Sequence, residues 1–164
     1  MHELTGPVWL IWLETSALAV AMRQWRWLYP IVEILHIVGF VILVGAAFMF
    51  DLRLLGLSRH VPVTDLERHH LRWARLSLWL VIPSGLMMFV AHATEMAANP
   101  AFHLKLILIV AAGLNAFTFH KGIFKSVKTW NREVETPWAA KLAGILSLIF
   151  WTGVISCGRL LAYL

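Results

Sequence analysis

Four apolar stretches, each long enough to cross a bilayer as a helix, constrain this sequence more than any other feature. The hydrocarbon core of a bilayer takes roughly 20 apolar residues of α-helix. The stretches cover residues 31–50, 76–91 with its flanks, 102–119 and 139–155. Backbone polar groups in lipid must be paired within their own segment or a closed barrel. Each stretch is therefore predicted to be a transmembrane helix.

The composition supports a membrane protein of one domain. The chain has 164 residues, of which 60% are hydrophobic and 14% charged, and its mean hydropathy is +0.73. A soluble domain has roughly 25% charged residues. The net charge of +5 fits basic cytoplasmic loops better than nucleic-acid binding. We therefore expect an all-α transmembrane four-helix bundle. Its expected partner is the lipid bilayer, and we expect no binding to nucleic acid.

Local signals predict where the helices begin and end. Proline is tolerated in the first turn of a helix, where its missing N–H would be unpaired anyway, and Pro30, Pro100 and Pro137 occupy such positions. Thr64 begins a sequence of the capping-box type, and Gly56 is expected to end the first helix. We predict one integral-membrane domain over residues 1–164, with membrane helices at 30–55, 64–96, 100–125 and 137–162.

The segment 7–22 is apolar but too short for a comfortable span. Four tryptophans lie in or after it, at Trp9, Trp12, Trp25 and Trp27. Tryptophan favours the headgroup level of a bilayer. We expect an additional N-terminal helix that lies in the membrane interface; a fifth span is the alternative.

Basic residues predict the orientation. The loops at 51–75 and 121–141 together carry ten Lys and Arg residues, while the opposite side carries four, namely Arg23, Arg26, Lys105 and Arg159. Cytoplasmic loops are enriched in basic residues. The expected location is a bacterial inner membrane, crossed several times, with both loops in the cytoplasm and both termini in the periplasm.

Ionisable residues near the predicted periplasmic face suggest a functional site. Glu33 and His36 stand three residues apart on the first helix, and His92 and Glu95 repeat the spacing in reverse order on the next, antiparallel one. Residues three apart share a helix face. We therefore expect His36 and His92 at one depth, Glu33 and Glu95 at another, and His103 nearby. Ionisable groups inside a membrane are costly and usually functional.

Two kinds of chemistry fit these residues. Imidazoles on facing helices can hold a haem iron from both sides. Imidazole and carboxylate can instead bind copper, zinc or iron directly, with the metal ligands drawn from His36, His92, His103, Glu33 and Glu95. The remaining interpretation is that these groups form local hydrogen bonds or are solvated at helix ends.

Three polar residues elsewhere have structural interpretations. Asp51 and Arg53 close the first helix on the cytoplasmic side and are expected to form an ion pair or to anchor a loop. Asn115 lies inside the third span, where an amide is typical of a hydrogen bond between helices.

Several motifs resemble a known family. The stretches "LYPIVEILHIVGF", "DLRLLGL", "NPAFHLKLILIVAAGLNAFTFH" and "GILSLIFWTGVISCGRLLAYL" are similar to a widespread bacterial family of small four-span inner-membrane proteins without assigned function. More distantly, the layout resembles four-span b-type cytochromes and copper-resistance membrane proteins, whose haems sit on paired histidines. That resemblance implies His36 as a haem ligand, with His92 or His103 as its partner.

The resulting hypothesis is a membrane haem b protein for electron transfer or redox sensing, which could make it an oxidoreductase. Copper beside the haem is a further expectation, and the partner would be a redox protein or a quinone. The haem propionates would face Arg23, Arg26, Lys105 or Arg159. The alternatives are a non-haem metal-binding protein for transport or resistance and a cofactor-free accessory subunit. A homodimer could form through small residues such as Gly39 and Gly45.

Overall fold

The computed structural model describes residues 6–161 and 163, and within these residues the chain is helical without a strand. The elements are α1 (Val8–Glu14), α2 (Ala17–Gln24), α3 (Leu28–Leu54), α4 (Val63–Ala91), α5 (Ala93–Ala98), α6 (Pro100–Lys121), the 3₁₀ helix η1 (Ile123–Thr129) and α7 (Trp138–Leu160).

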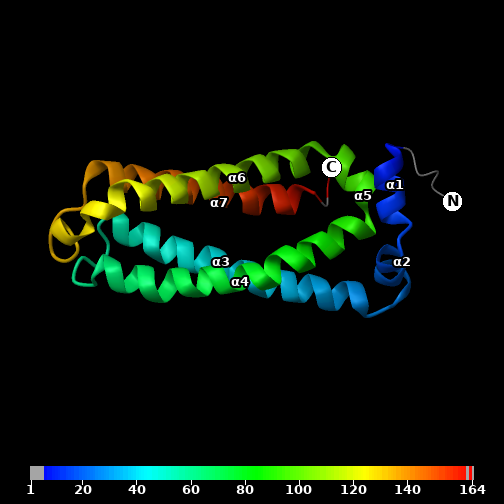
Figure 1. Ribbon diagram of the computed structural model, residues 1–164, viewed down its shortest axis with the longest axis horizontal. Helices are drawn as coiled ribbons and strands as arrows, with labels where there is room; N and C mark the ends of the chain where they lie inside the picture. The colour runs from blue at the N-terminus through cyan, green and yellow to red at the C-terminus, as the bar shows by residue number, and fades with distance from the viewer. Residues whose placement is uncertain (1–5, 162, 164) are drawn as a thin grey trace.

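The four long helices α3, α4, α6 and α7 run side by side along the long axis of the molecule (Figure 1). All four are long and apolar enough to cross a bilayer. Large apolar side chains cover their outer surfaces, with Val41 63%, Trp79 82% and Ile107 64% exposed. Such a surface needs lipid as its solvent, and the chain is a multi-pass membrane protein.

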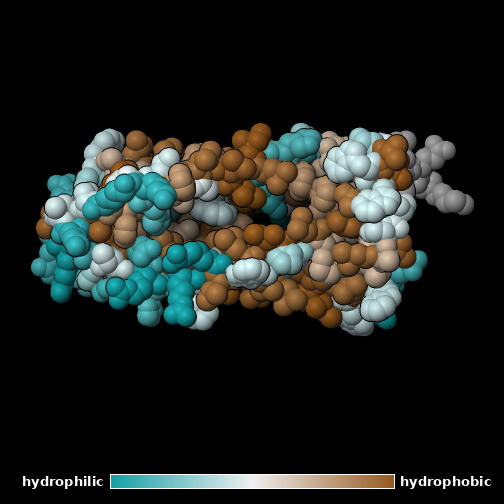
Figure 2. Space-filling view, in the orientation of Figure 1, coloured by the Kyte–Doolittle hydropathy of each residue, from teal (hydrophilic) through white to brown (hydrophobic). Residues whose placement is uncertain are grey.

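One end of the molecule carries α1, α2 and α5, and is named the α5 end; the other carries the α3–α4 loop and η1, and is named the η1 end (Figure 1). Hydrophilic residues gather at the η1 end, while the middle of the molecule is mainly hydrophobic (Figure 2). The η1 end corresponds to the predicted cytoplasmic face.

The four helices form two pairs that are joined on one side. α3 packs closely on α4, α6 on α7, and α3 also contacts α7. Glycine lets the partners approach, because an added Cβ at Gly39 would lie 2.9 Å from Val81 Cγ2 and one at Gly153 would lie 2.8 Å from Leu108 Cδ1. α4 and α6 meet at the α5 end, where Phe89 and Phe102 stack with ring centroids 5.4 Å apart.

Two expected helix boundaries are wrong. The second helix does not continue to residue 96 but breaks at His92, whose φ of −139° and ψ of 47° are not helical. The third ends at Lys121 rather than at 125, and η1 follows.

The expected capping box at Thr64 is not formed, because the Asn131 side chain accepts from the Thr64 N–H at 3.0 Å instead.

The N-terminal segment is two helices rather than the single one expected over 7–22. The chain leaves α1 at Thr15, and the Ser16 hydroxyl caps α2 by accepting from the Ala19 N–H at 3.3 Å. α1 and α2 lie across the α5 end of the bundle (Figure 1). Trp9 and Trp12 are 59% and 69% exposed there, as side chains anchored at headgroup level would be.

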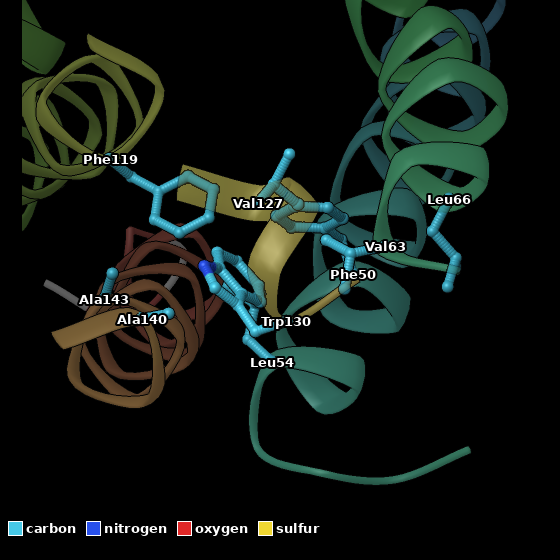
Figure 3. Packing of buried hydrophobic residues seen from close by; sticks show 9 residues of the cluster. All are labelled: Phe50, Leu54, Val63, Leu66, Phe119, Val127, Trp130, Ala140 and Ala143. Atoms are coloured by element: carbon cyan, nitrogen blue, oxygen red, sulfur yellow. The ribbon is translucent and has the colours of Figure 1, made fainter. Parts of the chain in front are cut away.

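A hydrophobic core closes the η1 end (Figure 3). Trp130 is 2% exposed and packs with Leu54, Phe119 and Ala140. The loop after η1 is therefore held between α3, α6 and α7, which fixes both loops of this end against the bundle.

Arg53 anchors these loops, but not through Asp51. Its Nε donates to Val61 O at 2.7 Å, and its Nη2 donates to Arg59 O at 3.2 Å and to Asn131 O at 3.1 Å. Among the described residues no ion pair joins Arg53 to Asp51. The expected loop anchor is confirmed and the expected ion pair is wrong, because residues two apart on a helix face different neighbours.

Candidate functional site

His36 is held by α4 through one of its two ring nitrogens. Its Nδ1 lies 3.1 Å from Val81 O and 3.0 Å from Ser84 Oγ. A carbonyl oxygen only accepts, so the Val81 contact places a proton on Nδ1, and in the neutral imidazole Nε2 is then the unprotonated nitrogen. Gly85 makes room for the ring, since an added Cβ there would lie 3.0 Å from His36 Cε1.

His92 does not share the depth of His36, and the expected match is wrong. His36 faces Val81 and Ser84 on α4, whereas His92 packs edge-on against Tyr29, with ring centroids 5.8 Å apart. Seven residues of α3 separate the two levels, which is roughly 10 Å at 1.5 Å per residue. The break after α4 places His92 beyond the helix that the expected pairing required.

The other predicted ligands are spread over the α5 end. His92 Nδ1 lies 3.7 Å from Glu95 Oε2, and Glu95 is 78% exposed at its side chain. Glu33 and His103 are exposed as well. Among the described residues, no group of three or more histidine, cysteine or acidic side chains is placed to hold one metal ion.

The basic residues predicted for haem propionates have other partners. Arg26 lies over the Trp27 ring at 5.4 Å, and Arg159 lies over Tyr163 at 4.9 Å. Lys105 is half-buried in α6, beside Cys157 and Gly158 of α7, and its charge acts on His36. Lys105 is therefore the basic residue of this set that the fold brings near His36.

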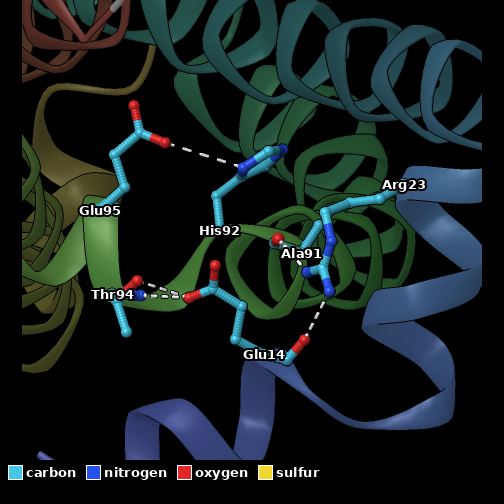
Figure 4. A network of polar contacts seen from close by, with 6 residues as sticks. All are labelled: Glu14, Arg23, Ala91, His92, Thr94 and Glu95. Atoms are coloured by element: carbon cyan, nitrogen blue, oxygen red, sulfur yellow. Dashed lines mark hydrogen bonds and ion pairs between the residues drawn. The ribbon is translucent and has the colours of Figure 1, made fainter. Parts of the chain in front are cut away.

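Arg23 belongs to a network that ties α1 and α2 to the break after α4 (Figure 4). Its Nη1 donates to Ala91 O at 2.6 Å and its Nη2 to Glu14 O at 2.8 Å. Glu14 Oε2 accepts from the Thr94 N–H at 2.9 Å and from the Thr94 hydroxyl at 2.6 Å. Burial opposes ionisation of this carboxyl, but Thr94 and the Arg23 charge outweigh burial and hold the pKa of Glu14 below its usual range. Glu14 thus caps α5.

A cavity of about 450 Å³ lies between the two helix pairs, towards the η1 end. The view in Figure 2 shows the molecule hollowed between α4 and α6. Apolar residues form most of its wall, including Leu43, Leu78, Ile109 and Trp151. Ligand pockets of proteins typically measure 300–1,000 Å³ and combine an apolar wall with a few polar groups.

Asp51 is the buried acid of this cavity. It is 5% exposed, and its Oδ2 has no hydrogen-bond partner within the described part of the chain. Ser147 of α7 is its polar neighbour. The amide of Asn115 is turned to Ala143 O at 2.9 Å, which confirms the expected bond between helices. Asp51 therefore lines the cavity and carries a buried oxygen, Oδ2, without a hydrogen-bond partner among the described residues.

An aromatic contact series connects the cavity to His36. The rings of His36 and Phe40 are nearly parallel with centroids 6.5 Å apart, and Phe40 meets Trp151 at 6.2 Å. Trp151 lines the cavity, whereas His36 does not. The two candidate sites are thus separate but adjacent.

Sequence reasoning missed the cavity and the role of Glu14. Both acids lie in segments that are otherwise apolar, and a buried carboxylate needs a partner. That signal was available from the sequence for Asp51 and Glu14. The carboxylate partner of Glu14, however, is Thr94, which lies 80 positions away. The cavity at Asp51 depends on the separation of α4 and α6, for which the sequence has no local pattern.

We expect Glu14→Gln to destabilise the protein in detergent by about 2 kcal/mol near neutral pH, the range for hydrogen bonds to a charged group. Because the folded-state pKa is lowered, the contribution is present above the ordinary value of 4.5 and is lost as the pH falls through the lower folded value. Thermal unfolding of both proteins from pH 7 downward measures this. Glu33→Gln, which removes an exposed carboxylate, is the control. A stability difference between wild type and Glu14→Gln that stays the same at acid pH would contradict the stabilising role of ionised Glu14.

Comparison with known proteins gives one match. A family model described as a family of unknown function (DUF6644) matches residues 9–164. No curated protein and no solved structure matches the chain. The match agrees with the resemblance to an uncharacterised family, while the distant resemblance to cytochromes and copper-resistance proteins stays a prediction. With nearly its whole length matched, the chain belongs to the DUF6644 family.

Proposed function

We propose that this protein binds a lipid-soluble molecule within the bilayer, in the cavity between α4 and α6, and holds its polar head group at Asp51. The observation that carries the proposal is that Asp51 lines a mainly apolar cavity of about 450 Å³ and has a buried Oδ2 without a partner within the described residues. Leaving a buried polar atom unpaired costs about 1–3 kcal/mol, and a ligand donor would remove that cost.

The lining indicates the class of ligand. The apolar wall of the cavity favours a ligand whose main part is apolar. Such a ligand would enter from the bilayer through the space between α4 and α6. A carboxyl oxygen favours a head group that donates a hydrogen bond, such as a hydroxyl or an amine. Glu67, Arg75 and His120 add polar groups to the same wall.

The cellular setting is proposed from charge. We place the chain in a bacterial inner membrane with the η1 end in the cytoplasm, because ten of the fourteen basic residues lie in the segments 51–75 and 121–141, which meet at that end. Both termini then lie in the periplasm.

A periplasm-active reporter fused after Leu164 is expected to be active, and an inactive reporter on an inserted protein would reverse the orientation.

A second candidate function is electron transfer through haem b bound at His36. The supporting observation is the Nδ1 contact with Val81 O, which orients the ring and leaves Nε2 free, as in histidines that ligate metals. Lys105 would balance a propionate charge. Bound haem would supply one-electron chemistry, and the series His36, Phe40, Trp151 would link it to a quinone in the cavity. His92, on another level, does not fit as the opposite ligand in this arrangement.

The cavity is tested by photolabelling in nanodiscs with a diazirine-bearing long-chain alcohol and with the matching alkane, which lacks the hydroxyl. We expect the alcohol to label cavity residues of α4 and α6. Asp51→Leu should weaken the alcohol labelling about tenfold, the loss expected for one hydrogen bond of about 1.4 kcal/mol. Labelling by the alkane should change little.

Two glycines provide a matched pair of controls. An added Cβ at Gly113 or at Gly45 meets no atom within 4 Å, and only Gly113 lines the cavity. Gly113→Leu should therefore block labelling while Gly45→Leu leaves it intact. Equal labelling of the two variants, or equal labelling by alcohol and alkane, would refute the proposed binding site.

The haem candidate is tested by the visible spectrum of protein expressed with ample haem. A Soret band that His36→Ala removes, and that His92→Ala preserves, is the expected result. Elemental analysis of the same samples checks for copper. Wild-type protein without a Soret band would end this candidate and leave the cavity proposal unaffected.

A further inference from the structure

A second cavity, of about 660 Å³, lies at the η1 end between the last turns of α3, the α3–α4 loop and the first turns of α4. We refer to it as the loop cavity. Its polar lining is mainly basic: Arg53, Arg68, His69 and His70, with Ser58 and one acid, Asp65. It shares no residue with the cavity between α4 and α6.

Arg53 is a buried charge without a counter-ion in this cavity. It is 2% exposed, and three backbone carbonyls take its Nε and Nη2. Its Nη1 has no partner within the described residues, and no carboxylate there lies within 4 Å of the guanidinium. Carbonyls offset part of the cost of burying a charge, but a full opposite charge is what such a site favours.

His70 provides a second indication that the loop cavity binds an anion. Its Nδ1 is also buried without a partner in the described part of the chain, and the residue lines the loop cavity. Arg68, two residues before His70 on α4 and also in the lining of the loop cavity, adds a positive charge. Guanidinium groups bind phosphate through paired, charge-assisted hydrogen bonds. Two unsatisfied nitrogens and a second arginine therefore favour a phosphate group.

The apolar part of the lining indicates where that phosphate comes from. Met49, Leu52 and Leu57 line the loop cavity, and Met49 and Leu57 are 53% and 54% exposed on the outside of the bundle. Arg53 stands at the end of a membrane helix, the level at which lipid headgroups lie. A phospholipid would place its phosphate at Arg53 and its first acyl carbons against Met49 and Leu57.

We propose that the loop cavity binds the phosphate of one anionic phospholipid, with Arg53, Arg68 and His70 as its ligands. The bound lipid would complete the anchor that Arg53 makes between the α3–α4 loop and Asn131. The inference does not depend on the ligand of the α4–α6 cavity, and either can fail without the other.

Native mass spectrometry of the full chain in detergent tests the proposal, with phosphatidylglycerol, phosphatidylcholine and inorganic phosphate added separately. The first phosphatidylglycerol should bind about tenfold more tightly than phosphatidylcholine. Inorganic phosphate should bind more weakly because it lacks the apolar contacts. If inorganic phosphate binds as tightly as phosphatidylglycerol, the ligand is a free anion and the proposal of a bound lipid is wrong. If both lipids bind equally tightly, the proposal of a site selective for an anionic phospholipid is wrong.

Matched variants separate a built site from general attraction to a basic surface. Arg68→Gln should weaken the first phosphatidylglycerol about fivefold, whereas Arg72→Gln should not; Arg72 is an exposed arginine one turn further along α4, outside the loop cavity. His70→Gln should also weaken it. Arg53→Gln should abolish the preference if it folds, and the Arg68 and His70 variants decide the matter if it does not. Equal losses from Arg68→Gln and Arg72→Gln would overturn the site.

Discussion

The position of α3 determines the rest of this structure. It is the helix that packs against both α4 and α7, and it can approach α4 closely because Gly39 and Gly85 have no side chain in the way. α4 and α6 are joined near the α5 end by the Phe89–Phe102 stack. A bundle held together along one side in this manner leaves space on the other, and the α4–α6 cavity occupies that space.

Several polar side chains inside the bundle are paired with backbone carbonyls of another helix or loop. His36 pairs with Val81 O, Asn115 with Ala143 O, and Arg53 with Val61 O. Carbonyls are available where α-helical bonding leaves a lone pair or a loop begins. Among the described residues, four buried polar side-chain atoms lack a partner: Asp51 Oδ2, Arg53 Nη1, His70 Nδ1 and Thr136 Oγ1. The first three belong to residues that line the two cavities, which is why both cavities are interpreted as binding sites.

The four membrane helices and the helical fold could be predicted from sequence, because length and apolar composition alone decide what can cross a bilayer. The breaks could not. The helix breaks at His92, where Glu14, 80 residues before Thr94 in the sequence, caps the following turn through Thr94. The α4 start depends in the same way on Asn131. Long-range caps of this kind leave no local pattern, so helix ends were the least accurate part of the prediction.

The candidate site was predicted in part. His36 was predicted to be a haem or metal ligand, and that prediction stands untested. Its contacts with Val81 and Ser84 on α4 could not be foreseen. Matching Glu33–His36 with His92–Glu95 assumed an uninterrupted helix. Asp51 was noticed only beside Arg53 in the sequence. Its place in a cavity follows from the separation of α4 and α6, which depends on packing between helices and on no motif.

That separation is the central claim, and distances between spin labels measure it directly. With Cys157 replaced, label pairs would be placed at Met88 and His103 near the α5 end, and at Leu78 and Gly113 in the cavity wall, each pair joining α4 to α6 at one depth. We predict a longer mean distance for the Leu78–Gly113 pair than for the Met88–His103 pair in lipid nanodiscs. Equal distances, or a shorter inner distance, would show a closed bundle and contradict the account.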